Sequence, residues 1–192
     1  MPGLRERNRA RTRAEIRARA LELIAKQGYA ATTVGQIAEA ADVSQSTFFR
    51  YFATKEDALL ADDFDPQIVE RFRAQPPDVT PFEAFGNALR EVFNALSDQE
   101  RETERERIRT ILTVPELRDR MLGSLSENIR LISVILAERV GRSAEDAEIE
   151  HFAGALVGVT IAAMFRATRD PRLDPLHLLD DAVAHLAAGL PL

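Results

Sequence analysis

The sequence lacks cysteine, so neither disulfide bonds nor thiolate metal sites contribute to the fold. It also lacks a long hydrophobic run: the longest candidate, from Phe152 to Phe165, contains two glycines and is shorter than the roughly 20 residues of a membrane-spanning helix. The Arg-rich N-terminus is not followed by an apolar segment, so we expect no secretory signal. The 192 residues are 45% apolar and 29% charged, which is typical of a soluble globule. We therefore expect a cytoplasmic protein that does not associate with membranes.

Positive charge is scarce outside the N-terminal part of the chain. The net charge is −6, yet residues 1–60 hold ten Lys and Arg against seven Asp and Glu, and the first 19 residues hold seven arginines. The remainder holds fifteen basic against twenty-four acidic residues. A basic head on an acidic body indicates that the head contacts a polyanion.

The alternation of Val, Ile and Thr that marks β-strands is absent as well. Helix-start signals are frequent instead. In a capping box, a Ser or Thr and an acid or amide three residues later accept hydrogen bonds from otherwise unpaired backbone N–H groups. Together with prolines at first helical positions, these signals predict an all-α protein of about nine helices. The expected starts lie near residues 12, 33, 44, 54, 80, 97, 115, 143 and 174.

Helix ends are indicated by glycine and proline. Gly28, Gly141 and Gly189 follow predicted helices, where a left-handed residue commonly ends the helix. Asp65-Pro66 is expected to kink or end the helix that starts near residue 54, because proline removes a backbone donor and clashes with the preceding turn.

The second and third predicted helices are short and are joined by the tight turn "ADVS". At 100° per residue, Phe48, Phe49 and Phe52 fall within an arc of about 100°, the width of a core-facing stripe. Two such helices predict a helix-turn-helix, whose second helix enters the DNA major groove. The opposite side of that helix is polar and is expected to contact DNA; it carries Ser46, Thr47, Arg50 and Tyr51.

The run "RARALELIAKQGYAATTVGQIAEAADVSQSTFFRYFATKEDALL", residues 17–60, resembles the DNA-binding head of the TetR/AcrR family of bacterial transcriptional repressors. The resemblance rests on Gly28, Thr33, Ile37-Ala38, Val43-Ser44, Thr47, Tyr51-Phe52 and Lys55-Glu56. It implies a DNA-binding domain over residues 1–53 and an effector-binding and dimerisation domain over residues 54–192. It further implies that bases or adjoining backbone are contacted by Gln45, Ser46, Thr47 and Arg50, and phosphates by Thr33, Tyr51 and Lys55.

Two residues depart from the family pattern. Asp42 stands where glycine is usual in the turn, although Asp tolerates left-handed geometry better than most residues. Phe49 stands where tyrosine is common, so one hydroxyl for a phosphate is missing, and Arg50 is expected to compensate. The arm "RERNRARTR" either enters the minor groove or stays near the phosphates and raises affinity.

The same resemblance implies an effector pocket in the body. The candidate lining residues are Phe85, Leu89, Phe93, Ile108, Leu112 and Ile129, with Asn87, Thr110 or Asn128 as polar contacts. Each of the apolar residues also fits an ordinary core position. Few charges are expected inside, so the effector should be apolar or amphipathic. The C-terminal stretch "DPLHLLDDAVAHLAAGL" resembles that of actinobacterial regulators in the mycofactocin-regulator branch, for which acyl-type effectors are plausible.

A homodimer is also expected. Gly154, Gly158 and Ala162 recur every four residues and form a stripe of small side chains that lets another helix approach closely. Exposed apolar neighbours such as Leu156 would need covering. The alternative is that the stripe packs inside the chain.

Two other classes of protein remain as alternatives: a small helical enzyme and an architectural DNA-binding protein without an effector. Three scattered histidines and no cysteine offer little for catalysis, and no nucleophile elbow, phosphate loop or dinucleotide fingerprint is present. Glu148 and His151 lie on adjacent helix turns but lack further ligands, so we expect neither a metal nor a cofactor. The segment "RETERERIR", residues 101–109, is interpreted as a solvated face.

Overall fold

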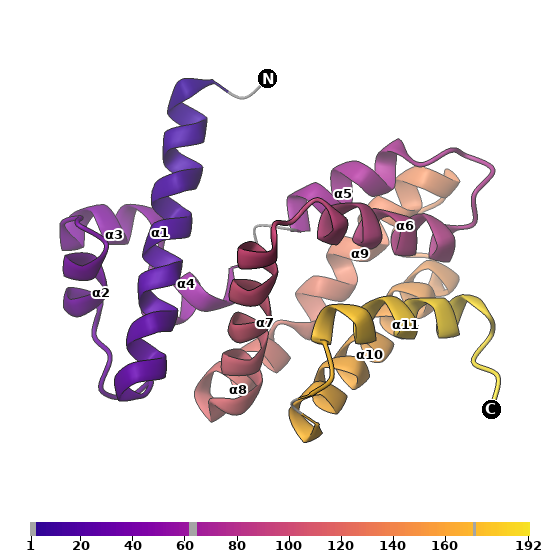
Figure 1. Ribbon diagram of the computed structural model, residues 1–192. Coiled ribbons are helices and arrows are strands. Elements are labelled where there is room, and N and C mark those ends of the chain that lie inside the picture. The colour runs from indigo at the N-terminus through magenta and orange to yellow at the C-terminus, as the bar shows by residue number, and fades with distance from the viewer. Residues whose placement is uncertain (1–2, 62–64, 171) are drawn as a thin grey trace. The chain divides into compact units, whose positions relative to one another are not determined.

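All regular secondary structure in the described part of the chain is helical (Figure 1). The computed structural model describes residues 3–61, 65–170 and 172–192. These ranges contain eleven α-helices and no strand, which confirms the all-α fold class. The helices form two compact units, Met1–Asp62 and Asp63–Leu192.

The N-terminal unit contains α1 (Leu4–Gln27), α2 (Val34–Ala40), α3 (Gln45–Tyr51) and α4 (Lys55–Leu60). α1 packs against α2 and α4, and α2 packs against α3. The apolar stripes expected on the first three helices are largely buried. The buried core residues of this unit include Ile16, Ala20, Leu21, Ile24, Ile37, Ala38, Phe48, Phe52 and Leu59.

The first helix is longer than predicted. α1 begins at Leu4 and not at Thr12, whose hydroxyl donates to the Asn8 carbonyl at 3.0 Å inside the helix. The residues between these positions are mostly Arg, Glu and Ala, which all favour helix, and no Gly or Pro interrupts them. The Arg-rich segment is therefore part of a helix, and a potential cap inside a good helical sequence does not start a new one.

Both left-handed positions of this unit were expected. Gly28 ends α1 with φ +84°, and Asp42 adopts φ +52° in the turn between α2 and α3. The Asp42 N–H donates to the Glu39 carbonyl at 3.1 Å. The predicted caps of α2, α3 and α4 are also confirmed, because the hydroxyls of Thr33, Ser44 and Thr54 each accept a hydrogen bond from a backbone N–H of the first turn.

The C-terminal unit contains the remaining seven helices. They are α5 (Asp65–Ala74), α6 (Pro81–Asn94), α7 (Asp98–Thr113), α8 (Pro115–Gly123), α9 (Leu125–Val140), α10 (Ala147–Arg169) and α11 (Pro175–Ala187). Capping boxes start α6 and α7, and Asp174 caps α11 ahead of Pro175, as predicted. α10 begins four residues later than expected. The Ser143 hydroxyl accepts from the Glu145 N–H at 3.2 Å and so stabilises a turn before the helix.

The structure has eleven helices in place of about nine because two predicted helices are each divided. The helix expected from residue 115 breaks at Ser124, where the backbone adopts φ −90°, ψ 7° between α8 and α9. The helix expected from residue 54 corresponds to α4 and α5. α4 ends at Leu60, and Pro66 lies in the first turn of α5, where a missing N–H breaks no helical hydrogen bond. The interruption thus precedes Asp65-Pro66.

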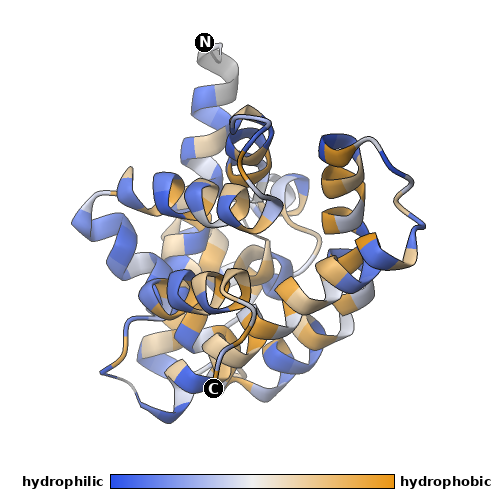
Figure 2. Cartoon of the chain, turned by 90° about the vertical axis from the view of Figure 1, so that its right-hand side faces the viewer, coloured by the Kyte–Doolittle hydropathy of each residue, from blue (hydrophilic) through white to orange (hydrophobic). Residues whose placement is uncertain are grey.

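The core of the C-terminal unit is built around α10, which packs against α9, α11 and α7. Figure 2 shows hydrophobic residues gathered on one side of most helices and hydrophilic residues on the other. α10 is long and apolar enough to cross a membrane by length and composition alone. Its buried residues contribute to the core of this unit, as expected of a central helix. They are Ile149, Ala153, Leu156, Val157, Ala163 and Ala167.

One polar region of α7 differs from expectation. The segment 101–109 was interpreted as a solvated face, yet Glu104 and Arg107 are both buried. The Arg107 Nε donates to Glu104 Oε2 at 2.8 Å, and a second hydrogen bond joins the same two groups. A buried charge is tolerated when it is paired in this way, and mixed-sign spacing along a sequence does not reveal which pair will be buried.

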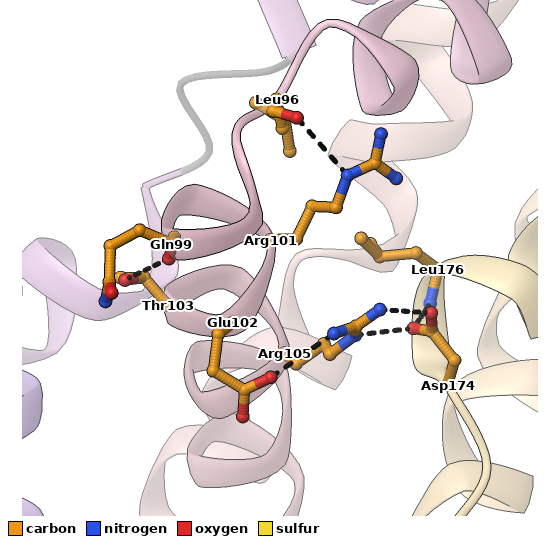
Figure 3. Close-up of polar contacts among 8 residues, drawn as sticks. All are labelled: Leu96, Gln99, Arg101, Glu102, Thr103, Arg105, Asp174 and Leu176. Atoms are coloured by element: carbon orange, nitrogen blue, oxygen red, sulfur yellow. Dashed lines mark hydrogen bonds and ion pairs between the residues drawn. The ribbon is translucent and has the colours of Figure 1, made fainter.

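A second ion pair joins α7 to α11 (Figure 3). Arg105 donates to both carboxylate oxygens of Asp174, at 3.1 and 2.7 Å, and to Glu102 at 3.2 Å. Asp174 also accepts from the Leu176 N–H at 3.0 Å and thus caps α11. The hydrogen bonds from Arg105 hold the pKa of the Asp174 carboxyl below its ordinary value, although partial burial opposes this shift.

Asp174→Asn should lower stability at neutral pH, because it removes the charge that pairs with Arg105 while Asn still caps the helix. The folded-state pKa of Asp174 is depressed, so its contribution is present above about pH 4 and is lost as the pH falls through the folded value. The pair is partly exposed, so we expect a loss of about 1 kcal/mol at neutral pH. The difference from wild type should shrink as the pH falls below about 4 and vanish only below the depressed folded-state pKa of Asp174. Thermal unfolding followed by circular dichroism across this range measures the effect.

Asp181→Asn is the matched control on the same helix, because Asp181 is mostly exposed and, within the described residues, its ion pair is with His177 at 3.7 Å. A difference between Asp174→Asn and wild type that stays constant from neutral to acidic pH would show that the ion pair does not stabilise the fold.

Candidate DNA-binding interface

The start of α3 is a cluster of hydroxyl groups. Ser44 Oγ accepts from the Thr47 N–H at 3.1 Å and lies 3.0 Å from Ser46 Oγ and 2.9 Å from Thr47 Oγ1. Ser44 and Ser46 are exposed, whereas Thr47 is half-buried. The cap therefore positions two of the predicted DNA-contacting side chains, and of these Ser46 is the more accessible.

The opposite side of α3 is anchored in the core. Phe48 is 0% and Phe52 is 3% exposed, and their ring centroids lie 5.9 Å apart. The expectation that Phe49 is buried with them is wrong, since 53% of Phe49 is exposed. Two phenylalanines fill the space under this seven-residue helix, and the third lies on its flank. An arc of 100° on a helical wheel includes such flanking positions.

Gln45 and Arg50 are exposed on α3, as expected for side chains that contact DNA. Gln45 also lies close to α2: a Cβ added to Gly35 would be 3.1 Å from Gln45 Nε2. The absence of a side chain at Gly35 thus leaves room for the Gln45 amide. The Arg50 guanidinium carbon lies 5.7 Å from the centroid of the neighbouring Tyr51 ring.

The predicted phosphate contacts have different surroundings. Thr33 is exposed and caps α2, with Gln36 accepting from the Thr33 N–H at 2.9 Å. Tyr51 is half-buried. Lys55 Nζ donates to the carbonyls of Tyr29 and Thr32 at 2.8 and 3.0 Å and lies 3.9 Å from the Tyr29 ring centroid. Lys55 thus joins α4 to the turn after α1, and its contact with phosphate stays a prediction.

Several of the N-terminal arginines have partners inside the unit. Arg17 is buried, and its Nε donates to the Ala58 carbonyl at 3.1 Å, with a further bond to the Ala61 carbonyl. Arg13 lies over the Phe52 ring at 4.7 Å, and Arg19 pairs with two glutamates of α1. No local pattern distinguished Arg17 from its neighbours. The exposed arginines of the described part of this segment are Arg7, Arg9 and Arg11.

Five of the candidate effector-site residues lie together in the C-terminal unit. Leu89, Phe93, Ile108 and Leu112 belong to one buried apolar cluster, and Phe85 packs against it. Asn128 is exposed and Ile129 is half-buried, and neither belongs to that cluster. Asn87 is occupied by hydrogen bonds with Gln75 and Arg90. The sequence reasoning missed Ser133, a buried residue of α9 whose hydroxyl has no hydrogen-bond partner within the described ranges.

A cleft of about 320 Å³ lies elsewhere, between α5 and α9. Its polar groups bind one another or the backbone: Arg73 pairs with Glu138 at 2.7 Å, and Arg139 donates to one carbonyl near the end of α5 and to three carbonyls of the segment after it. Such groups are already satisfied, so the cleft offers little to recognise a ligand.

The small-residue stripe of α10 is open. A Cβ added at Gly154 or Gly158 would meet no heavy atom within 4 Å, and Ala162 is exposed. The stripe therefore does not pack inside the described part of the chain. Leu156, which was expected to be an exposed neighbour, is buried in the core. It lies on the opposite side of the helix from the stripe.

The acidic and histidine side chains do not form a metal site in the described residues, which contain no group of three or more potential ligands. Glu148 pairs with Arg142 at 2.5 Å, and His151 is exposed.

Comparisons with known proteins agree with this arrangement. Residues 16–61 match the family described as "Bacterial regulatory proteins, tetR family", and residues 79–191 match the "MftR C-terminal domain". The chain is 42% identical over 103 residues to the HTH-type transcriptional regulator TcmR of Streptomyces glaucescens, a match that covers 53% of this chain and 46% of TcmR. It is 28% identical to the putative mycofactocin biosynthesis transcriptional regulator MftR of Mycobacterium tuberculosis, over 96% of this chain and 93% of MftR.

Among solved structures, the chain resembles Thermus thermophilus FadR, a transcriptional repressor in complex with lauroyl-CoA. The TM-score is 0.54 at 23% identity, and the match covers 94% of this chain and 95% of FadR. At that identity the likeness shows the fold. The two family matches show more: the chain is a transcriptional regulator of the TetR family, with a C-terminal domain of the MftR type.

Proposed function

We propose that this regulator is a repressor that binds an operator duplex as a homodimer and is released by a small apolar or amphipathic effector. The observation that carries the proposal is the polar face of α3, where Gln45, Ser46 and Arg50 are exposed on a helix anchored by Phe48 and Phe52. A short helix with this arrangement fits the major groove. Residues 1–53 would bind DNA, residues 54–192 would bind the effector and the second subunit, and the protein would work in the cytoplasm.

The class of effector follows from the C-terminal unit. The cluster that holds most of the candidate effector-site residues consists of apolar side chains, so an apolar body is the chemistry it would accept. FadR binds lauroyl-CoA, an amphipathic molecule with an acyl chain. An acyl compound is therefore the first effector to test here. An architectural DNA-binding protein would show no response to any such ligand, and an enzyme would convert the ligand and ignore the operator.

Gln45→Ala should weaken binding to the operator by about 1–3 kcal/mol and leave binding to a scrambled duplex unchanged, if the amide reads a base edge. Arg50→Gln, the matched variant on the same helix, should weaken both duplexes alike and reduce the salt slope by about one, if the guanidinium binds phosphate. Fluorescence anisotropy over a range of salt concentrations compares the variants on an operator selected from random duplexes. Equal losses on both duplexes for Gln45→Ala would make Gln45 a backbone contact.

Gly35→Ala tests the position of Gln45 without removing it. The new methyl group would lie 3.1 Å from Gln45 Nε2 and displace the amide. Alanine also favours helix over glycine by up to about 1 kcal/mol, so the variant should stay folded. We expect weaker binding to the operator from Gly35→Ala in wild type and no further loss in the Gln45→Ala background.

Gly158→Leu should disrupt the dimer, because the stripe on α10 has no partner in the described part of the chain and leucine would prevent close approach of another helix. Analytical ultracentrifugation of the full chain measures the change, and circular dichroism checks the fold. Asp119→Leu, which places a leucine on exposed α8, controls for added surface hydrophobicity. If Gly158→Leu sediments as an undisturbed dimer, the interface lies elsewhere.

Effector and operator should weaken each other by the same factor. Two DNA-binding heads fit successive major grooves only at a spacing of about 34–36 Å, so a ligand that favours another spacing disfavours DNA. Acyl-CoAs of increasing chain length, lauroyl-CoA included, are the compounds to titrate with and without the selected operator. An acyl-CoA that binds tightly but with the same affinity in both titrations would show that the C-terminal unit does not control DNA binding.

A further inference from the structure

Phe49 is the one phenylalanine of α3 that the N-terminal unit does not bury. It is 53% exposed, whereas its neighbours Phe48 and Phe52 are in the core. The Phe49 ring stands edge-on to Phe48, with centroids 5.6 Å apart and planes at 87°. The buried Phe48 ring therefore braces Phe49 in a fixed orientation on the surface. Single exposed apolar residues are common, so exposure alone does not indicate a function for Phe49. Its position on the helix is the informative feature.

Phe49 lies on the flank of α3 that also carries Gln45. The two residues are four positions apart and so lie one above the other on the same side of the helix. The Gln45 amide extends toward Gly35, where the missing side chain leaves room for it. Arg50, the next residue, is exposed beside Phe49. An apolar ring is thus placed among the polar side chains that face the DNA.

The chemistry of the ring limits its partners on a duplex. Phenylalanine has no hydrogen-bonding group, so it cannot bind a phosphate oxygen or a polar base edge as tyrosine would. The apolar group that the major groove presents is the C5-methyl of thymine. Four residues of helix rise about 6 Å, and successive base pairs are about 3.4 Å apart. A thymine within about two base pairs of the base next to Gln45 is therefore in reach.

We propose that Phe49 is a specificity-determining residue that packs against a thymine C5-methyl group in each half of the operator. The inference rests on the proposed binding of operator DNA by α3. It assigns to Phe49 a sequence-reading contact in place of the phosphate contact that a tyrosine at this position would make.

Deoxyuridine tests the contact, because it differs from thymine only by the missing methyl group. The full-length protein is first used to select binding duplexes from a random library. Each thymine of the selected site is then replaced singly by deoxyuridine, and affinity is measured for wild type, Phe49→Ala and Phe49→Leu. At one thymine per half-site, the substitution should weaken wild type about fourfold, the factor that corresponds to burial of one methyl group. Substitution in both halves should weaken it about fifteenfold.

Phe49→Ala should bind the thymine and deoxyuridine duplexes equally, and Phe49→Leu should retain part of the preference. About half of the side chain is exposed and it contacts one buried ring, so both variants should stay folded with only a small loss of thermal stability, which circular dichroism checks. Phe49→Tyr shows whether a hydroxyl here adds a phosphate contact, which would raise affinity for all sequences alike.

Three outcomes would overturn the proposal. In the first, no deoxyuridine substitution weakens wild type. In the second, the substitution weakens Phe49→Ala as much as wild type, so that another residue or the stiffness of the DNA senses the methyl group. In the third, Phe49→Ala loses affinity equally for operator and scrambled duplexes, so that the ring packs on the sugar-phosphate backbone. If the library yields no preferred sequence at all, the proposed operator binding fails together with this inference.

Discussion

The structure of the DNA-binding unit depends on the burial of Phe48 and Phe52 beneath α3. A helix of seven residues is not stable on its own, because nucleation costs more than so few hydrogen bonds return. Full burial of each phenylalanine contributes about 1.5–3 kcal/mol, which exceeds what the Ser44 cap alone contributes, typically about 1 kcal/mol. The direction in which Gln45, Ser46 and Arg50 point is therefore set by tertiary packing on the other side of the helix. If α3 binds DNA as proposed, recognition of DNA depends on the same two side chains that stabilise the unit.

Some cations of the N-terminal segment bind groups inside the unit, and others are exposed and could contact a polyanion. Arg17 is buried against the last carbonyls of α4, where a cation also interacts favourably with the helix dipole. Arg13 covers Phe52, the same ring that anchors α3. Arg7, Arg9 and Arg11 remain exposed nearer the start of α1, and Lys26 is exposed in its last turn. The number of positive charges accessible to a polyanion is thus smaller than the total charge of the segment. Because the segment is helical, it presents the exposed arginines on a rigid element.

Local signals predicted much of this fold. Hydroxyl caps at Thr33, Ser44 and Thr54, left-handed Gly28 and Asp42, and Asp174 ahead of Pro175 are all found, because each depends on a few neighbouring residues. Where two local signals compete, their relative strength was harder to judge. The potential cap at Thr12 lies inside α1, since the residues before it also favour helix.

The same distinction holds for the candidate site. Exposure of Gln45, Ser46 and Arg50 followed from helical periodicity, but that of Phe49 did not, because its fate depends on how much space remains beneath α3. Lys55 was placed correctly at the start of α4, yet its bonds to the carbonyls of Tyr29 and Thr32 join residues more than twenty positions apart. Burial of Glu104 with Arg107 likewise has no local signature. Sequence spacing alone does not reveal whether a side chain stabilises the fold, contacts a ligand or does both.

Two sets of polar contacts join elements of the C-terminal unit, whose apolar cluster is the proposed effector site. Arg105 and Asp174 join α7 to the start of α11, and Arg139 binds the carbonyls that follow α5. The cluster consists of apolar side chains, so a ligand that entered it would replace contacts among these side chains with apolar contacts to the ligand. Selectivity among such ligands then rests on length and shape, since one methylene changes binding by only about 1 kcal/mol. The buried Ser133 hydroxyl of α9 has no hydrogen-bond partner in the described residues, and an unmade hydrogen bond in the interior costs about 1–3 kcal/mol. A ligand that placed one polar group against that hydroxyl would recover this energy, whereas a pure hydrocarbon would not.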